Sequence, residues 1–298
     1  MKEITYTFII PHHNCPDLLD RCLSSIPQRD DIQIIVVDDN SDADKKPMEC
    51  GRPEVEYIYI DKNDTKGAGK ARNIGLSKAK GKWLLFPDSD DQYIDCFFNC
   101  LDEYKNLNFD VLYFNSEYRD GITGESIPNF VLNEIISNYN NSQESLDKIK
   151  FCNNPPWNKM ILREFVLQNN LYFEEVPNGN DILFSLLAGY YAKKIHIDKR
   201  SLYSYNRNVN SIVSKCNKSV PSILCKIEHR VKLIYFYNYI GYEDYNIPVF
   251  RYLLSLIYVS PLSLTCKLLF NFIRKYPSIY KRRNEWVKII SSNRNIKE

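Results

Sequence analysis

Residues 67–91 read GAGKARNIGLSKAKGKWLLFPDSDD, and the fold can be worked out from this stretch. A segment of helical composition over 68–80 ends at a glycine, and a short apolar run follows at 83–86. Pro87 stops that run, which is typical of a buried strand. The next residues, 88–91, include three aspartates. A helix, a buried strand and polar residues at the carboxyl end of that strand predict an α/β fold that binds ligands at this edge.

The chain before and after this stretch also alternates strand and helix patterns. The run at 32–37, IQIIVV, is continuous and rich in β-branched residues, as expected for a central parallel strand. Further strands are expected at 6–11, 55–60 and 111–114, and further helices at 17–26 and 96–107. This alternation predicts a mostly parallel sheet with helices on both faces.

The alternation of strand and helix patterns becomes less regular after residue 115. The polar segment 129–141 is expected to be a loop or an insertion. Helices are expected at 157–169 and 180–192, and short strands at 195–197 and 202–205. From residue 222 onward the sequence is helical and rich in Tyr. We therefore predict an α/β domain over 1–220, followed by a helical C-terminal region over 221–298.

The composition is that of a globular protein. Hydrophobic residues make up 44% of the 298 residues and charged residues 26%, which excludes a disordered chain. Residues 222–298 contain 13 Lys and Arg against 5 Asp and Glu, so this part is basic while the rest is acidic. The basic region could meet an anionic membrane surface or a phosphate-bearing acceptor, or it could be a solvated helical face.

Cysteine usage and hydropathy favour a cytoplasmic location. The nine Cys include no CxxC pair, which indicates reduced thiols. No leader pattern opens the sequence. The longest uncharged apolar stretch near the C-terminus, 252–266, has 15 residues and contains a proline, whereas a membrane span needs about 20 apolar residues. A cytoplasmic protein of this kind could also bind peripherally to the inner face of the cell membrane.

The aspartates at 88, 90 and 91 are the sharpest feature of the sequence. Three carboxylates within four residues repel one another unless a cation or hydrogen-bond donors compensate. Mg²⁺ typically uses one or two carboxylates together with substrate phosphates, so the cluster could hold a metal that bridges a diphosphate. The alternative is an Asx turn that leads into a helix cap.

Three further segments contain candidate ligand-binding residues. Asp38 and Asp39 end a buried strand and could accept N–H bonds from a nucleobase edge. The loop 66–73, KGAGKARN, enters a helix, and helix N-termini with nearby Arg and Lys favour phosphate. Asp181 follows Asn180 at the start of an apolar helix and could act as a general base towards an acceptor hydroxyl. The respective alternatives are a capped turn, a helix start with solvated lysines, and ordinary helix capping.

Taken together, these segments resemble glycosyltransferase family 2, the inverting enzymes with the GT-A fold. The residues that support the resemblance are FIIPHHN at 8–14, IIVVDDNS at 34–41, the stretch 67–91, PPWNKMI at 155–161 and NGNDILF at 178–184. They occur in the family's order and at its usual separations, over residues 4–206. The resemblance implies the inverting transfer of a hexosyl unit from a nucleotide-sugar, UDP-linked by family frequency, with Mg²⁺ or Mn²⁺ as cofactor.

The resemblance also implies a role for each matching position. The residues that would bind the nucleotide-sugar are Pro11, His13, Asn14, Asp38, Asp39, Lys66, Arg72, Asp88 and Asp90. The metal ligands would be Asp90 and Asp91, within an acidic motif of the DxD type, with Asp88 as an alternative to Asp91. The acceptor side would include Trp157, Lys159 and Asn180, and the catalytic base would be Asp181.

Two positions depart from the family's pattern. Asn180 stands where Glu is common, so the base that follows is kept while the polarity beside it changes. His13 stands where an aromatic Tyr is frequent. Both departures leave the expected chemistry in place.

The expected acceptor is a saccharide or a lipid-linked saccharide, as for an enzyme of surface polysaccharide or glycolipid synthesis. One alternative function is a non-catalytic nucleotide-sugar-binding protein of the same fold, which would have no need of Asp181. Another is a sugar-phosphate nucleotidyltransferase, which would want a Gly- and Arg-rich loop after the first strand, where this chain has PHHN. No nucleic-acid partner is expected, because the N-terminal part is acidic and lacks a basic strand interleaved with aromatic residues.

Apolar residues of the C-terminal region recur at helical spacing over 250–258 and 268–273. We expect these stripes to pack on the catalytic domain. The alternative is docking on a membrane surface, with charge supplied by basic residues of 274–283.

Overall fold

The computed structural model describes residues 3–61, 67–128, 131–176, 178–207 and 220–242, together with positions 267, 270 and 274. The chain divides into two compact units, Met1–Glu175 with Asn180–Val209 and Val176–Gly179 with Asn210–Glu298. The division falls before the boundary predicted at 220/221. Predicted features that lie outside the described residues are Lys66, the stripe 250–258, the stripe 268–273 apart from Phe270, and the basic positions 275–283.

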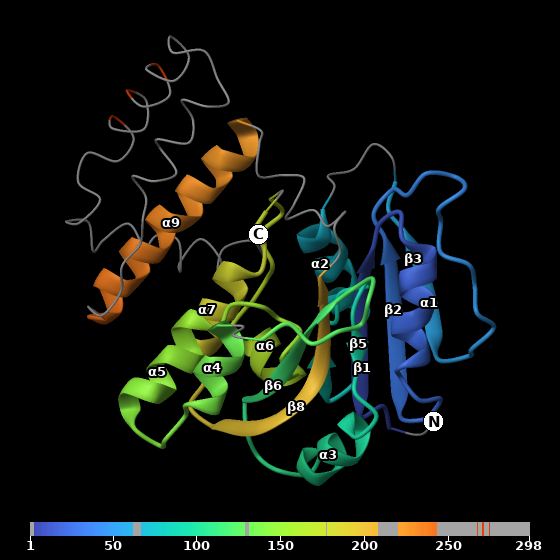
Figure 1. Ribbon diagram of the computed structural model, residues 1–298, viewed down its shortest axis with the longest axis horizontal. Helices are drawn as coiled ribbons and strands as arrows, with labels where there is room; N and C mark the ends of the chain where they lie inside the picture. Colours follow the sequence, from blue (N-terminus) through green and yellow to red (C-terminus); the bar gives the residue numbers. More distant parts are fainter. Residues whose placement is uncertain are drawn as a thin grey trace. The chain divides into compact units, whose positions relative to one another are not determined.

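The first unit is built on one eight-stranded sheet with the order β3-β2-β1-β4-β7-β6-β8-β5 (Figure 1). Its strands are β1 (Tyr6–His12), β2 (Ile32–Asp38), β3 (Val55–Tyr59), β4 (Trp83–Leu85), β5 (Gln92–Tyr93), β6 (Val111–Asp120), β7 (Lys159–Leu162) and β8 (Ile195–Arg207). The pairs β1–β2, β1–β4, β2–β3 and β6–β8 are parallel. β7 runs antiparallel between β4 and β6, and β5 is antiparallel to β8. The prediction of a mostly parallel sheet is confirmed.

The helices of the first unit cover both faces of this sheet. They are α1 (Pro16–Ser24), α2 (Ala68–Lys78), α3 (Phe97–Tyr104), α4 (Val131–Ser137), α5 (Gln143–Cys152), α6 (Arg163–Gln168) and α7 (Ile182–Tyr191). Side chains of α1 and α3 pack with one set of alternating residues of β1 and β2 in the main core cluster. Ala71 of α2 packs with the other set, which includes Ile35 and Val37. Because successive strand residues point to opposite faces, these helices lie on opposite sides of the sheet.

The central strands have the burial that their composition predicts. Every residue of β1 and of β2 is buried, as expected for parallel strands covered on both faces. Gly75 of α2 lets the helix approach β1 closely, because a Cβ at this position would lie 2.4 Å from the Ile9 side chain. The close approach brings the N-terminus of α2 to the edge where β1 and β2 end.

Three sequence predictions differ from the structure. The helix predicted over 157–169 is instead strand β7 followed by the short helix α6. The predicted loop 129–141 contains helix α4. The two short strands expected at 195–197 and 202–205 form one strand, β8, with register irregularities opposite β6.

The described part of the second unit is mainly helix α9 (Val220–Ile240), which confirms a helical C-terminal region. Its buried residues Ile227, Val231 and Ile234 recur at helical spacing. Within this unit, the Asn178 amide donates to the Ser222 hydroxyl at 3.0 Å. In the part of the chain that the structure describes, no helix is both long and apolar enough to cross a membrane.

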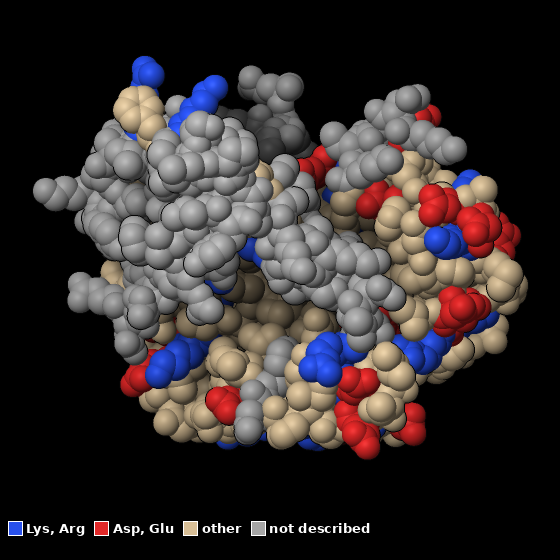
Figure 2. All heavy atoms as spheres, turned by 45° about the horizontal axis from the view of Figure 1, so that its top comes forward, with Lys and Arg blue, Asp and Glu red and all other residues tan. Residues whose placement is uncertain are grey.

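Acidic and basic side chains of the described residues lie side by side on the face shown in Figure 2. Among the described residues of the whole molecule, surface ion pairs join Lys148 to Glu144 at 2.6 Å and Arg200 to Glu103 at 2.8 Å. The described residues of this face therefore present no continuous basic stripe.

Candidate active site

The carboxyl ends of β1, β2 and β4 meet at one edge of the sheet. β1 lies between β2 and β4 and is parallel to both, and His12 at its end is opposite Asp38. Pro11, opposite Val37, lies one residue before this edge. The segments that follow the three strands, at 13–14, 39–41 and 88–91, are therefore neighbours, as the sequence predicted.

Asp38 is bound from inside the protein. The residue is 2% exposed, and its Oδ1 lies 2.9 Å from Nδ1 of the buried His12. It also accepts from the hydroxyl and the backbone N–H of Ser41, at 2.5 and 3.2 Å. The structure therefore uses Asp38 to hold the loop after β2, and a direct role for it in nucleotide binding stays a prediction.

His13 and Asn14 join the loop after β1 to the loop after β2. Nδ1 of His13 lies 2.8 Å from the backbone carbonyl of Asp39. The Asn14 side chain accepts from the backbone N–H of Asp42 at 2.8 Å and donates to its carboxylate at 3.1 Å. Asn14 has φ +56°, in the left-handed region that Asn tolerates better than most residues. His13 remains exposed at the edge, where a nucleobase or ribose could reach it.

Asp39 connects this edge to the glycine-containing loop. Its Oδ2 accepts from the backbone N–H of Gly67 at 2.8 Å. Gly67 has φ +121° and lies at the N-cap of α2, so the loop can turn into the helix here without side-chain strain. The loop and the strand end are thus held together, as a shared nucleotide site requires.

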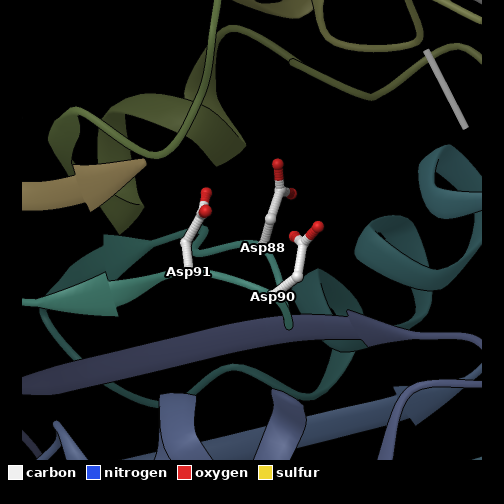
Figure 3. Close-up of side chains that lie close together, drawn as sticks. All are labelled: Asp88, Asp90 and Asp91. Carbon is white, nitrogen blue, oxygen red and sulfur yellow. The ribbon is translucent and has the colours of Figure 1, made fainter. Parts of the chain in front are cut away.

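The acidic turn 88–91 brings its three carboxylates together. Ligand oxygens of Asp88, Asp90 and Asp91 all lie within 4.8 Å of one another. Figure 3 shows the three side chains rising from the turn towards the same side. Asp88 and Asp90 are partly exposed, whereas Asp91 is fully buried. The donor set is all oxygen, which is the set that Mg²⁺ and Mn²⁺ prefer.

Asp91 is held by strand β8. Its Oδ1 accepts from the backbone N–H of Asn206 at 2.7 Å, and its Oδ2 accepts from the Tyr203 hydroxyl at 2.9 Å. Burial raises the pKa of Asp91 well above its usual range, and the charges of Asp90 and Asp88 raise it further. The hydrogen bonds from β8 act in the opposite direction and favour the carboxylate.

Arg72 of α2 links the acidic turn to the start of α7. It is 5% exposed, and its guanidinium donates to Oδ1 of Asp88 at 2.5 Å and to Oδ1 of Asn180 at 2.6 Å. The guanidinium also lies 5.3 Å from the centroid of the Phe173 ring. A buried cation beside two segments with carboxylates is well placed to compensate negative charge.

Asp181 lies at the N-cap of α7 but does not cap the helix with its side chain. The side chain therefore makes no capping hydrogen bond, and the residue as a whole is partly exposed. Burial raises the pKa of Asp181 above its ordinary value, while the charges of Arg72 and Lys159 lower it and that of Asp88 raises it. These charges act on Asp181 because the turn, α2 and β7 all come close to the start of α7.

Lys159 and Trp157 support the site from inside. The Lys159 ammonium is fully buried and donates to the carbonyls of Asn153, at 2.9 Å, and Pro155, and to Oδ1 of Asn158 at 3.1 Å. Burial lowers the pKa of Lys159 to about 7, against the attraction of Asp181. Trp157 is also buried and stacks on Tyr203, with 4.9 Å between ring centroids. An acceptor-side role for these two residues stays a prediction, and they would act through the loop that they hold.

Replacing Lys159 by Met is expected to lower the free energy of unfolding by about 3 kcal/mol, because buried acceptors that lose their donor cost about 1–3 kcal/mol each. Urea unfolding followed by circular dichroism measures this. Lys148→Met, at a surface ion pair of α5, serves as the control and should change stability by less than about 0.5 kcal/mol. An unchanged unfolding midpoint for Lys159→Met would show that the three contacts do not stabilise the fold.

Four residues that contact the candidate site were not among the predicted ones: Ser41, Phe173, Tyr203 and Asn206. Ser41 follows Asp38 closely and could have been found as the partner in an Asp-x-x-Ser turn. Tyr203 and Asn206 lie on a strand that is remote in sequence from the acidic turn, so local patterns contain no signal for their contacts with it.

The comparisons with known proteins agree with this geometry. The family model described as glycosyl transferase family 2 matches residues 7–167, more than half of the chain. The chain belongs to this family. The uncharacterized glycosyltransferase EpsJ of Bacillus subtilis is 25% identical over 273 residues, which cover 84% of this chain and 76% of EpsJ. A poly(ribitol-phosphate) beta-glucosyltransferase of Bacillus spizizenii is 27% identical over 210 residues, which cover 67% of this chain and 32% of that enzyme.

The fold agrees with solved structures of family members. The crystal structure of S. aureus TarS 1-349 in complex with UDP-GlcNAc aligns with a TM-score of 0.61 and 20% identity, over 85% of this chain and 70% of that structure. The similarity confirms the GT-A fold. Membership of glycosyl transferase family 2, together with relatives that are named glycosyltransferases, identifies this chain as a glycosyltransferase.

Proposed function

We propose that this glycosyltransferase transfers a hexosyl group from a UDP-linked sugar to an acceptor hydroxyl, with inversion and with a divalent cation as cofactor. The observation that carries the proposal is the position of Arg72, which is bonded both to Asp88 in the acidic turn and to Asn180 next to Asp181. This link supports the proposal that the donor-side acids and the candidate base belong to one site.

The residues of the turn fit a divalent cation. Three carboxylates with oxygens within 4.8 Å of one another form a compact oxygen donor set, and two of them are accessible from outside. Asp88 and Asp90 would hold the cation, and Asp91 would contribute to the same cluster. When bound, the cation would stabilise the negative charge on the diphosphate leaving group.

The remaining steps belong to the side chains of this chain. Arg72 would add positive charge beside the leaving group, in a buried position where charge is weakly screened. Asp181 would accept the proton of the acceptor hydroxyl as the oxygen attacks the anomeric carbon. A base on the opposite side of the sugar from the leaving group gives a single displacement with inversion.

The comparisons support the choice of substrates. The aligned TarS structure is a complex with UDP-GlcNAc, and two relatives are named as enzymes that act on poly(ribitol-phosphate). We propose a UDP-sugar donor and a saccharide, polyol or lipid-linked acceptor for this chain, in the synthesis of a surface polysaccharide or related polymer.

UDP is expected to bind the parent protein more tightly when Mn²⁺ is present, and Asp90→Asn should weaken that Mn²⁺-dependent binding at least about tenfold. Isothermal titration of UDP with and without Mn²⁺ measures the effect, and hydrolysis of a panel of nucleotide-sugars identifies the donor. Asp95→Asn is the control, because Asp95 is exposed and follows the turn closely. UDP affinity that is the same with and without Mn²⁺ in the parent protein would contradict the cation role.

A further inference from the structure

Tyr203 of β8 connects the two ends of the acidic turn. Its hydroxyl oxygen accepts from the backbone N–H of Asp88 at 3.0 Å, and its O–H donates to Oδ2 of Asp91 at 2.9 Å. A phenol has one proton to donate and can accept at the same time, so both contacts form together. One hydroxyl group thus binds the first and the last acid of the turn.

Asp91 is anchored inside the protein by hydrogen bonds from β8. Both of its carboxylate oxygens accept from β8, one from Tyr203 and one from the backbone N–H of Asn206. Its side chain is fully buried, whereas Asp88 and Asp90 are partly exposed. In Figure 3 all three carboxylates rise from the same turn, and Asp88 and Asp90 are the pair that is partly exposed to a ligand.

The position of the Tyr203 hydroxyl is set by packing. The ring is fully buried, stacks on Trp157 with an interplanar angle of 8°, and meets the edge of Tyr93 at 5.2 Å between centroids. The Asn206 amide adds a bond to the backbone carbonyl of Asp90 at 3.3 Å. Rigid support behind a group of ligands fixes their orientation, and such support usually matters nearly as much as the ligands.

We propose that Tyr203 and Asp91 form a clamp that sets the geometry of the acidic turn. Asp91 is a positioning residue in this arrangement, and the cation is bound by the oxygens of Asp88 and Asp90. The inference rests on the proposed cation role of the turn. It also assigns a function to β8, a strand that carries none of the predicted site residues.

The test measures Mn²⁺ affinity by electron paramagnetic resonance of free Mn²⁺ in the presence of UDP. Tyr203→Phe keeps the ring and removes the hydroxyl, so Mn²⁺ affinity should fall about 10- to 100-fold, the range seen when a group that supports metal ligands is removed. Asp91→Asn should give a loss in the same range. The double variant should bind Mn²⁺ about as well as either single variant, because each substitution breaks the same clamp.

Tyr93→Phe is the matched control. Tyr93 packs against Tyr203, and its buried hydroxyl has no hydrogen-bond partner among the described residues, so its removal should leave Mn²⁺ affinity within about twofold. The clamp is wrong if Tyr203→Phe behaves like Tyr93→Phe. It is also wrong if the losses of the two single variants multiply in the double variant, since that result makes Asp91 an independent ligand.

A second readout does not depend on the cation. The urea midpoints of the parent, the two single variants and the double variant should show that the two substitutions are not additive, since both act on one hydrogen-bonded unit. Absence of Mn²⁺ binding in the parent would remove the cation from the proposed function but leave this readout intact. Additive shifts of the midpoints would then overturn the clamp itself.

Discussion

Asp181→Asn is expected to lower kcat by about 10²- to 10⁴-fold, the usual contribution of a general base, while UDP affinity in the presence of Mn²⁺ stays within about twofold of the parent. Asparagine has nearly the same shape as aspartate but cannot accept the proton of the acceptor hydroxyl. The Asp181 side chain makes no capping hydrogen bond, so the substitution removes no bond that starts α7. The loss should therefore appear in the chemical step and not in folding.

The pH dependence of the transfer rate of the parent protein is a second test of Asp181 as the base. Asp181 accepts a proton only when it is ionised, so the rate of transfer should fall as the pH falls through its pKa. Burial raises that pKa above the ordinary value of an aspartate, which moves the acid limb of the profile towards higher pH. Asp181→Asn should lose this limb.

Initial-rate kinetics with the donor found by screening would measure both effects, with Asp95→Asn as a matched control at an exposed position. Asp95→Asn should keep the parent's kcat and its acid limb. A kcat for Asp181→Asn within about threefold of the parent would assign the base to another residue. A parallel loss of UDP affinity would instead place Asp181 on the donor side.

The central strands could be predicted because their residues are mostly apolar and because helices cover both faces of the sheet at this position. The β2 run, IQIIVV, is apolar apart from Gln33 and is buried on both faces. The residues after it end the strand at the sheet edge. The same logic brought Asp39 and the acidic turn to one place before any contact was known, since parallel neighbours end at the same edge. These predictions needed only local composition and the rules of parallel sheets.

The predictions that were wrong concern segments whose structure depends on distant partners. β7 is only four residues long and exists because β4 and β6 pair with it on both sides. Its residues run into helix α6 without a break in the apolar pattern, which is why a single helix was predicted. β8 continues through the polar residues at 198–201 because β6 pairs with it on both sides of the irregularity at 199–200.

Helix α4 was missed for a related reason. The segment 129–141 contains five Asn, which led to the loop prediction, although α4 itself reads VLNEIIS. Of the residues of α4 only Ile136 is buried. Hydrogen bonds attach it to β6, from the Asn115 amide to Ser137 at 2.9 Å and from the Ser116 hydroxyl to Asn133 at 2.8 Å. Polar contacts of this kind leave no hydrophobic period in the sequence. The contacts of Tyr203 with the acidic turn were invisible for the same reason.

Arg72→Met is expected to lower kcat/KM by about 10²- to 10³-fold, comparable to the loss of one group that stabilises charge in a transition state. The substitution removes the positive charge beside the proposed leaving group and breaks the bonds to Asp88 and Asn180. It should also lower the free energy of unfolding by about 2–3 kcal/mol. Fully buried ion pairs lose about 3–5 kcal/mol when one partner is removed, and Asp88 is partly exposed, which reduces the cost.

Arg52→Met separates the loss of catalysis from the loss of stability. Arg52 pairs with Glu54 at 2.7 Å and donates to the carbonyls of Leu23 and Ile26, away from the candidate site. Its substitution should destabilise the protein to a similar extent yet leave kcat/KM within about threefold of the parent below the unfolding transition. Equal losses of kcat/KM in both variants would mean that Arg72 acts only through stability.

Arg72→Lys distinguishes charge from geometry. Lysine keeps the positive charge, but its single ammonium lacks the planar fork with which Arg72 reaches Asp88 and Asn180 together. If charge beside the diphosphate is what matters, Arg72→Lys should regain a large part of the kcat/KM that Arg72→Met loses. The link between the acidic turn and the start of α7 could matter more than the charge. In that case the lysine variant should stay as impaired as the methionine variant, because Asp181 would no longer be held in position relative to the donor.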